Sequence, residues 1–145
     1  MSRRDRYHNA LRLTLEKDGW TITADPLILR LEGIDLKADL GAEKTFAAEK
    51  AGQKIALELK EFTAISAVSE LEKTVGQLQF YQWALDAQEP EQVLFLAMSQ
   101  TTYRKHFLKP LFQLAVQRNK INLLIYQPDL EEVVQWITHN DMLNF

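Results

Sequence analysis

The sequence contains no cysteine, and glycine and proline are scarce, with five and four among 145 residues. The lack of cysteine excludes disulfide bonds and thiolate metal ligands, and it is typical of a reducing compartment. No internal repeat or low-complexity segment interrupts the chain, and 46% of its residues are hydrophobic. We therefore expect a single domain over residues 1–145 with a core of its own.

Long apolar runs are also missing. No stretch approaches the roughly 20 apolar residues that cross a bilayer, and no apolar segment follows the arginines near the N-terminus, as a secretory signal would require. The sequence therefore predicts a cytoplasmic protein without a membrane partner.

Acidic residues are absent between Glu91 and Asp129, although the whole chain carries a formal net charge of −3. The net charge argues against indiscriminate nucleic-acid binding. The acid-free stretch has two interpretations: helices with solvated basic faces, or a patch that contacts a phosphate backbone or an acidic partner. Its basic residues are Arg104, Lys105, Lys109, Arg118 and Lys120.

Hydrophobic periodicity predicts helices and strands in alternation. Helices are expected over 4–17, 66–86 (capped by Ser66 or Ser69, the latter in a capping box with Glu72) and 101–117, the last restarted at Pro110. Strands are expected over 20–23, 27–31, 34–40, 45–50, 53–60, 93–97 and 121–126, and residues 128–137 fit a helix or a strand. This order predicts an α/β fold: a mixed sheet with an antiparallel hairpin core, flanked by helices.

The hairpin carries the residues of greatest chemical interest. Its turn is expected at Ala51-Gly52, and alternation in the second strand separates an apolar face from a polar one. Glu58 and Lys60 share the polar face, about 7 Å apart at two residues of strand rise. The apolar face consists of Ile55, Leu57 and Leu59.

Two carboxylates beside a lysine suit metal-assisted phosphodiester hydrolysis. Mg²⁺ and Mn²⁺ prefer oxygen ligands, lower the pKa of a bound water and neutralise charge on phosphorus. We assign the metal to Asp39, Glu58 and the main-chain carbonyl of Leu59, and the positioning of water to Lys60. Glu43 and Glu49 are the secondary candidates for the role of Asp39.

The long predicted helix adds a second polar pair. Gln77 and Tyr81 are four residues apart and share one helix face, where plain packing favours leucine. One interpretation is a hydrogen-bonded pair at the helix edge, and the other is support for the metal site and DNA. Lys73, one turn earlier, can join this face, and Arg104 and Lys105 are further candidates for contacting DNA.

Together these residues resemble the PD-(D/E)XK nuclease superfamily, whose RecB-type members carry a similar glutamine-tyrosine motif. Nearly the whole chain is similar to the XisH family of fdxN-element excision controlling factors, through DGWTIT (18–23), DPL (25–27), DLGAE (39–43), AEK (48–50), QKIA (53–56), ELK (58–60) and GQ (76–77). The resemblance implies a restriction-endonuclease-like fold and a role in site-specific DNA excision. It also implies a recombinase and a small XisI-like protein as partners.

Three functions follow from these observations. The first is an excision controlling factor that binds DNA and hydrolyses phosphodiesters with Mg²⁺ or Mn²⁺. The second is a non-catalytic adaptor that joins a recombinase, DNA and a small partner protein. The third is a purely structural interaction protein, which requires Glu58 and Lys60 to lie on an open, solvent-facing sheet. The sequence leaves the oligomeric state open, self-association included.

Overall fold

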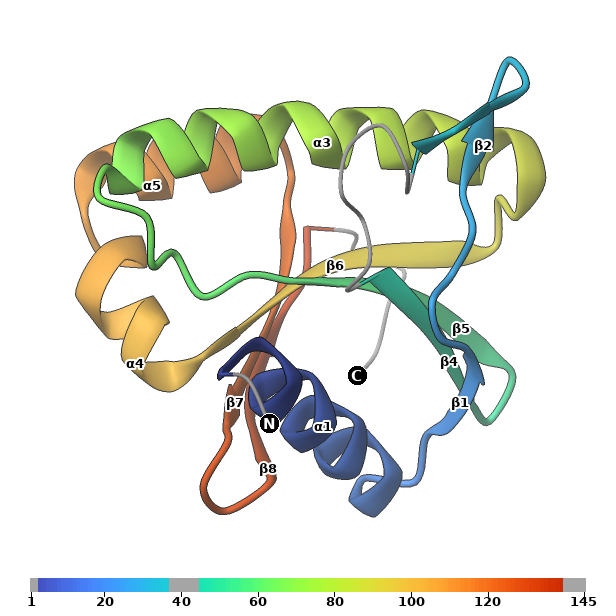
Figure 1. Cartoon of the computed structure of the whole chain (residues 1–145), viewed down its shortest axis with the longest axis horizontal. Helices are drawn as coiled ribbons and strands as arrows, with labels where there is room; N and C mark the ends of the chain where they lie inside the picture. The colour runs from blue at the N-terminus through green and yellow to red at the C-terminus, as the bar shows by residue number, and fades with distance from the viewer. Residues whose placement is uncertain (1–2, 37–44, 140–145) are drawn as a thin grey trace.

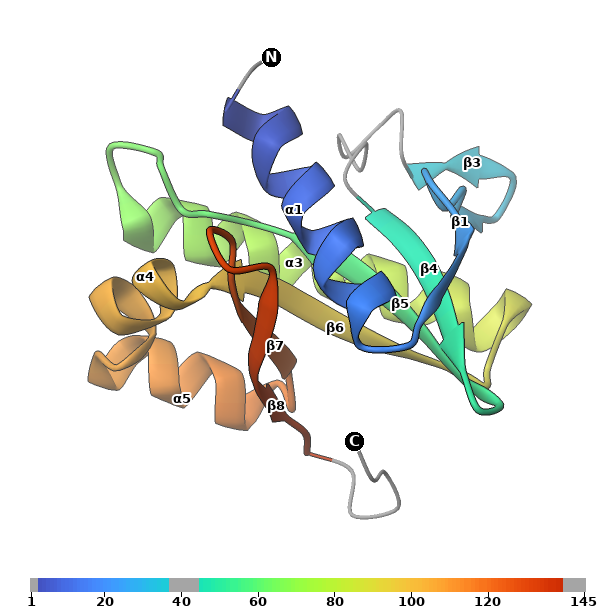
Figure 2. The ribbon, with the colours of Figure 1, turned by 90° about the horizontal axis from the view of Figure 1, so that it is seen from below.

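A computed structural model describes residues 3–36 and 45–139. Six strands form one mixed sheet in the order β1-β4-β5-β6-β7-β8. Helices cover both faces of this sheet, as Figure 1 and Figure 2 show from two directions. The predicted α/β class with a mixed sheet and flanking helices is therefore confirmed.

The strands and helices follow the predicted order. The sheet strands are β1 (Thr21–Ala24), β4 (Thr45–Lys50), β5 (Gln53–Leu59), β6 (Gln92–Ser99), β7 (Asn122–Gln127) and β8 (Glu132–Ile137), and a separate small hairpin pairs β2 (Arg30–Leu31) with β3 (Ile34–Asp35). The helical segments are α1 (Arg3–Lys17), α3 (Ala67–Gln88), α4 (Gln100–Thr102), the π-helical turn η1 (Tyr103–Phe107) and α5 (Pro110–Arg118).

Strand direction divides the sheet into an antiparallel and a parallel part. The strands β1, β4 and β5 pair antiparallel, β5, β6 and β7 pair parallel, and β8 returns antiparallel to β7. The parallel pairs require crossovers, and α3 and the α4-η1-α5 segment provide them. The antiparallel hairpin core expected from the sequence is β4 with β5.

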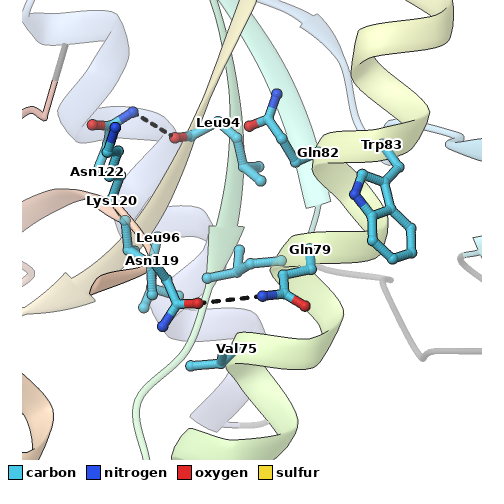
Figure 3. Close-up of a pocket in the computed structure, with 11 residues that line it drawn as sticks. Val75, Gln79, Gln82, Trp83, Leu94, Leu96, Asn119, Lys120 and Asn122 are labelled. Atoms are coloured by element: carbon cyan, nitrogen blue, oxygen red, sulfur yellow. Dashed lines mark hydrogen bonds between the residues drawn. The ribbon is translucent and has the colours of Figure 1, made fainter. Parts of the chain in front are cut away.

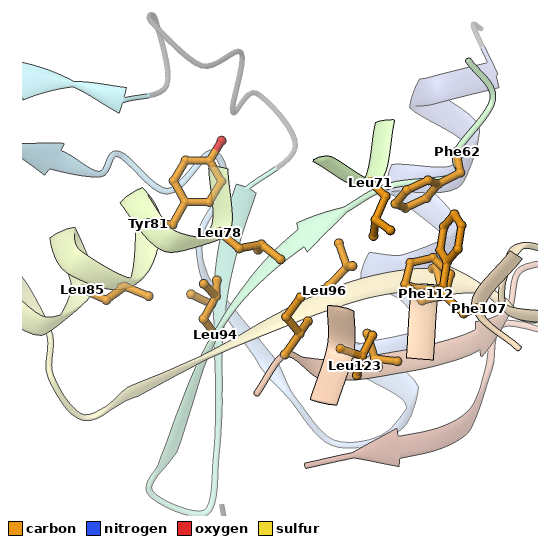
Figure 4. Close-up of a cluster of buried hydrophobic side chains, with 14 of the residues drawn as sticks. Phe62, Leu71, Leu78, Tyr81, Leu85, Leu94, Leu96, Phe107, Phe112 and Leu123 are labelled. Carbon is orange, nitrogen blue, oxygen red and sulfur yellow. The ribbon is translucent and has the colours of Figure 1, made fainter. Parts of the chain in front are cut away.

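Two hydrophobic clusters lie on the two faces of the sheet. On one face α1 packs on Ile55, Leu57 and Leu59 of β5, which confirms the predicted apolar parity of this strand. On the other face α3 and α5 pack on Ala56 and on alternate residues of β6 and β7. Figure 4 shows part of this second cluster, in which leucines of α3 meet leucines of the sheet. β6 is buried on both faces, as the wholly apolar run over residues 93–97 predicts.

Several boundaries differ from prediction. The strand expected over 27–31 shortens to β2, because Leu29 is buried in the cluster beneath α3 and its carbonyl accepts the Leu36 amide outside any strand. Of the strand expected over 34–40, the described part is β3. Ser66, rather than Ser69, caps α3: its hydroxyl accepts from the Ser69 amide. The segment over 128–137 contains the strand β8.

The turn between β4 and β5 has both central residues in the left-handed region, with φ of 51° at Ala51 and 82° at Gly52. This is the geometry of a type I′ turn, which matches the twist of a two-residue hairpin and favours Asn-Gly. Glycine accepts this conformation readily, whereas alanine is strained in it. The two-residue turn that sets the hairpin register therefore places Ala51 in a strained backbone conformation.

Replacing Ala51 with asparagine should relieve that strain. We expect Ala51→Asn to raise the free energy of unfolding by about 0.5–1 kcal/mol, since asparagine tolerates the left-handed region better. Gly52→Ala is the matched control and should lower the free energy of unfolding. The space around Gly52 is open, so only the left-handed backbone conformation opposes the added methyl group. Urea unfolding of both variants checks the prediction, and a loss of stability in Ala51→Asn contradicts it.

Candidate metal and nucleic-acid site

Glu58 is a buried carboxylate in the middle of the sheet, with 2% of its surface exposed. It lies opposite Thr45 of β4 and beside Leu96 of β6. The Thr45 hydroxyl donates a short hydrogen bond to Glu58 Oε2. Alternation places Glu58 on the same face as Ala56, beneath α3. The open, solvent-facing surface that a purely structural role requires is therefore not found at Glu58.

Lys60 continues the strand past the end of β5, because its amide donates to the Ala97 carbonyl at 3.0 Å. The same alternation puts its half-buried side chain on the Glu58 side of the sheet. A trans peptide directs the Leu59 carbonyl opposite to the Lys60 amide, away from β6. That carbonyl therefore points to the β4 side, just beyond Thr45, where the Glu58 carboxylate is bound.

Gln77 and Tyr81 lie on the buried face of α3. Tyr81 is fully buried and belongs to the cluster that contains Ala56, two residues before Glu58. In Figure 4 the ring of Tyr81 points to a different side of the helix from Leu78 and Leu85, which point toward Leu94 of β6. Both residues are therefore buried on the helix that covers the sheet face of Glu58.

The three basic candidates lie on exposed surfaces. Lys73 is one helical turn before Gln77 on α3, and Arg104 and Lys105 are consecutive residues of η1. Lys105 lines a cavity at the end of β5, and Arg104 does not line that cavity.

The other acidic candidates are Asp39, the second carboxylate of the predicted metal site, and its alternatives Glu43 and Glu49. Asp39 and Glu43 lie outside the described residues. Glu49 pairs with Lys54, four ladder positions from the Thr45–Glu58 pair and therefore about 13 Å along the sheet. Glu49 is thus not brought beside Glu58. Within residues 3–36 and 45–139, no group of three or more histidine, aspartate or glutamate side chains is arranged to hold a metal ion.

A cavity of about 680 Å³ begins one residue after Lys60, between the loop that enters α3 and the α4-η1 segment. Glu61 forms one wall, and its carboxylate accepts from the Ser99 amide at 2.9 Å, the Ser99 hydroxyl at 2.6 Å and the Thr102 hydroxyl at 2.8 Å. Lys105 and Lys109 also line the cavity. Glu61 is the only acidic side chain among the described lining residues, so two lysines against one carboxylate leave the cavity with a net positive charge.

His106 lies between these lysines in sequence and lines the same cavity. Its ring stacks on Phe112 with centroids 5.9 Å apart, and its Nδ1 atom has no hydrogen-bond partner among the described residues. Burial lowers the pKa of His106, and the charges of Lys109 and Lys105 lower it further. Both effects favour the neutral form of His106.

Sequence reasoning missed Thr45, Glu61 and His106. Thr45 could have been predicted from the sequence, because a two-residue turn at Ala51-Gly52 fixes which residue lies opposite Glu58. The roles of Glu61 and His106 depend on how α4 and η1 pack beside β5. No spacing in the sequence carries that information.

The fold and site define a mixed α/β protein in which a hairpin strand carries a buried glutamate beneath α3, the longest described helix of the chain. A model of the XisH protein family matches residues 1–134, and no curated protein matches the sequence. The chain belongs to the XisH family. No described helix is long and apolar enough to cross a membrane.

Two solved structures are similar over nearly the whole chain. One is an XisH family protein from Nostoc punctiforme PCC 73102, with 39% identity, a TM-score of 0.84, and coverage of 92% of this chain and 100% of that one. The other is an fdxN element excision controlling factor protein from Anabaena variabilis, with 39% identity, a TM-score of 0.84, and coverage of 93% and 100%.

The lowered pKa of His106 should make stability depend on pH. When the pH falls below 6.5, the ordinary pKa of histidine, His106 takes up a proton in the unfolded chain. In the folded chain the lowered pKa opposes that protonation. The free energy of unfolding should therefore fall as the pH drops from about 7.5 to 5.5, and it should fall less in His106→Phe, which keeps the stacked ring. Urea unfolding at both pH values measures the difference, and equal falls in parent and variant contradict the prediction.

Proposed function

We propose that this protein is a DNA-excision controlling factor on a PD-(D/E)XK nuclease-like frame, which binds DNA and hydrolyses phosphodiester bonds with Mg²⁺ or Mn²⁺. The observation that carries the proposal is the buried carboxylate of Glu58, followed two residues later by Lys60, on the sheet face beneath α3, whose buried residues include Gln77 and Tyr81. The excision role comes from the similar Anabaena variabilis protein, which is described as such a factor.

Burial of Glu58 supports a cation at this position. An ionised carboxylate loses several kcal/mol when it leaves water unless hydrogen bonds or an opposite charge compensate. The Thr45 hydroxyl supplies one such bond. A hard divalent ion is a further partner that such a carboxylate can hold, because carboxylates are the ligands that Mg²⁺ and Mn²⁺ prefer.

The metal would be held by Glu58, the Leu59 carbonyl and Asp39. When bound, it supplies a water of lowered pKa and neutralises charge on phosphorus. Lys60 orients the attacking water and offsets the negative charge that develops on the phosphate oxygens. Gln77 and Tyr81 hold the carboxylate side of the site in place from α3.

The basic cavity gives the DNA backbone a path away from Lys60. Lys105 and Lys109 line it, and the acidic side chain within it is already engaged by Ser99 and Thr102. Lysines bind phosphate as point charges and carry no base preference. Target choice in this proposal therefore comes from elsewhere, through the site-specific recombinase and the small XisI-like protein proposed as partners.

Cleavage depends on Glu58 in this proposal. We expect Glu58→Gln to lower the Mn²⁺-dependent nicking of supercoiled plasmid roughly 100-fold, since the amide keeps the shape and removes the charge that holds the metal. The variant is preferable to Glu58→Ala, which would also leave a hole in the buried sheet face. Gel separation of nicked from supercoiled plasmid measures the rate.

Glu49→Gln is the matched control, because it makes the same charge change on the neighbouring strand away from the site. It should nick at the parental rate. Equal activity in parent and Glu58→Gln would show that the catalytic assignment is wrong. If the parent binds DNA but never nicks it with Mg²⁺ or Mn²⁺, the result supports the adaptor function and rejects hydrolysis.

DNA binding depends on the basic cavity. We expect Lys105→Ala with Lys109→Ala to reduce the slope of log binding constant against log salt by about 2, since each duplex phosphate contact contributes about 0.9. Lys17→Ala with Lys54→Ala is the control, removing the same charge from lysines paired with Glu131 and Glu91. Fluorescence anisotropy of labelled duplex DNA at several salt concentrations measures both slopes. An unchanged slope in the first pair places the DNA elsewhere.

A further inference from the structure

A second cavity of about 270 Å³ lies on the other flank of α3 (Figure 3). It opens between α3, the first half of β6 and the turn that leads from α5 into β7. Its floor is apolar, and its volume is slightly below the roughly 300–1,000 Å³ of small-molecule sites. It therefore suits one compact ring system. The floor residues are Val75, Leu78, Leu94, Leu96 and Ile121.

One wall of this cavity is held rigid by asparagines. The Asn122 amide donates to the Leu94 carbonyl at 3.2 Å, and its oxygen accepts from the His139 amide at 2.9 Å. Asn119 donates to the Ala115 carbonyl at 2.8 Å. These bonds fix the wall and leave recognition to the groups on the facing helix.

The facing helix contributes two glutamines. The Gln79 amide donates to Asn119 Oδ1 at 3.2 Å, and the Gln82 amide donates to Asp86 Oδ1 at 2.9 Å. In Figure 3 the carbonyl oxygen of Gln82 points toward Leu94 at the cavity floor, whereas that of Gln79 points away from Asn119. Gln82 thus presents a hydrogen-bond acceptor to the cavity, fixed in orientation by its bond to Asp86.

An aromatic ring and a cation complete the lining. Trp83 is 53% exposed, and Phe80 supports it in an edge-to-face contact with centroids 5.1 Å apart. Lys120 lies across the cavity in the turn before β7, and no acidic side chain is among the described lining residues. The site therefore offers an indole ring at its edge, an acceptor and a positive charge around an apolar floor.

We infer that this cavity binds an amino-bearing nucleobase of a nucleotide, with the base on the apolar floor against Trp83. Each lining group matches one part of such a ligand. Indole rings stack on bases of any identity, the Gln82 oxygen accepts from an exocyclic amine, and Lys120 attracts the phosphate. Thymine has no exocyclic amine and is disfavoured. The ligand is either a free nucleotide or an unpaired base of single-stranded DNA.

This inference does not rest on the proposed cleavage. Helical spacing of 100° per residue puts Gln79, Gln82 and Trp83 on a different flank of α3 from Gln77 and Tyr81. Binding at the cavity should therefore persist in Glu58→Gln without metal. That measurement separates a failure of this site from a failure of the proposed active site.

Calorimetric titration of the full chain without metal tests the site, with dAMP, dCMP and dTMP in one arm and short oligo(dA), oligo(dC) and oligo(dT) in the other. We expect the adenine and cytosine ligands to bind more tightly than thymine. Trp83→Ala should weaken binding about 10-fold, and Gln82→Leu should abolish the preference over thymine. Leu108→Ala, which removes an exposed apolar side chain outside the cavity, should stay within about twofold of the parent.

The two arms identify the source. Equal affinity for mononucleotide and oligomer supports a free nucleotide, and binding of the oligomers alone supports an unpaired DNA base. The inference is overturned if neither arm binds, if Trp83→Ala binds as the parent does, or if thymine ligands bind as well as the others.

Discussion

The pairing of β4 with β5 through a two-residue turn is the constraint on which the candidate active site depends. The turn at Ala51-Gly52 fixes the register of every residue along the two strands, and it places Thr45 opposite Glu58. Strand alternation then sends Glu58 to one face and its apolar neighbours to the other. A slip of one residue would exchange the two faces and bury the leucines where the carboxylate now lies.

The helix α3 connects this hairpin to the rest of the molecule. It begins shortly after Lys60, crosses one face of the sheet and ends where β6 starts, so it supplies the crossover that makes β5 and β6 parallel. Its buried face covers the sheet surface that carries Glu58, and another flank borders the smaller cavity. The two candidate sites therefore share one rigid element.

Local patterns predicted the fold better than the site. The boundaries of β4, the turn at Ala51-Gly52 and the restart of helix at Pro110 follow from alternation, turn chemistry and the missing proline amide, all of which act over a few residues. The identification of Glu58 also follows from local alternation. Hydrogen bonds such as those between Glu61 and Ser99 join residues 38 apart, and tertiary packing alone decides them.

The segment expected over 27–31 shows the same limit. A strand is expected there, yet Leu29 is buried beneath α3, and the burial of one large side chain outweighs a weak strand preference. The predicted metal site is described only in part. Alternation places Glu58 and Lys60 on the same side of the sheet, whereas Asp39, the second carboxylate, stays a prediction.

The length of α3 between Gln77 and Trp83 has a consequence for variation among related chains. Insertion of one residue in an α-helix rotates everything after it by 100°. Such an insertion after Gln77 would carry Tyr81 away from the sheet and swing the Trp83 ring off its cavity in the same motion. Homologues that keep both surfaces must therefore accept changes of side chain within this span, and they must place insertions in the loops at either end.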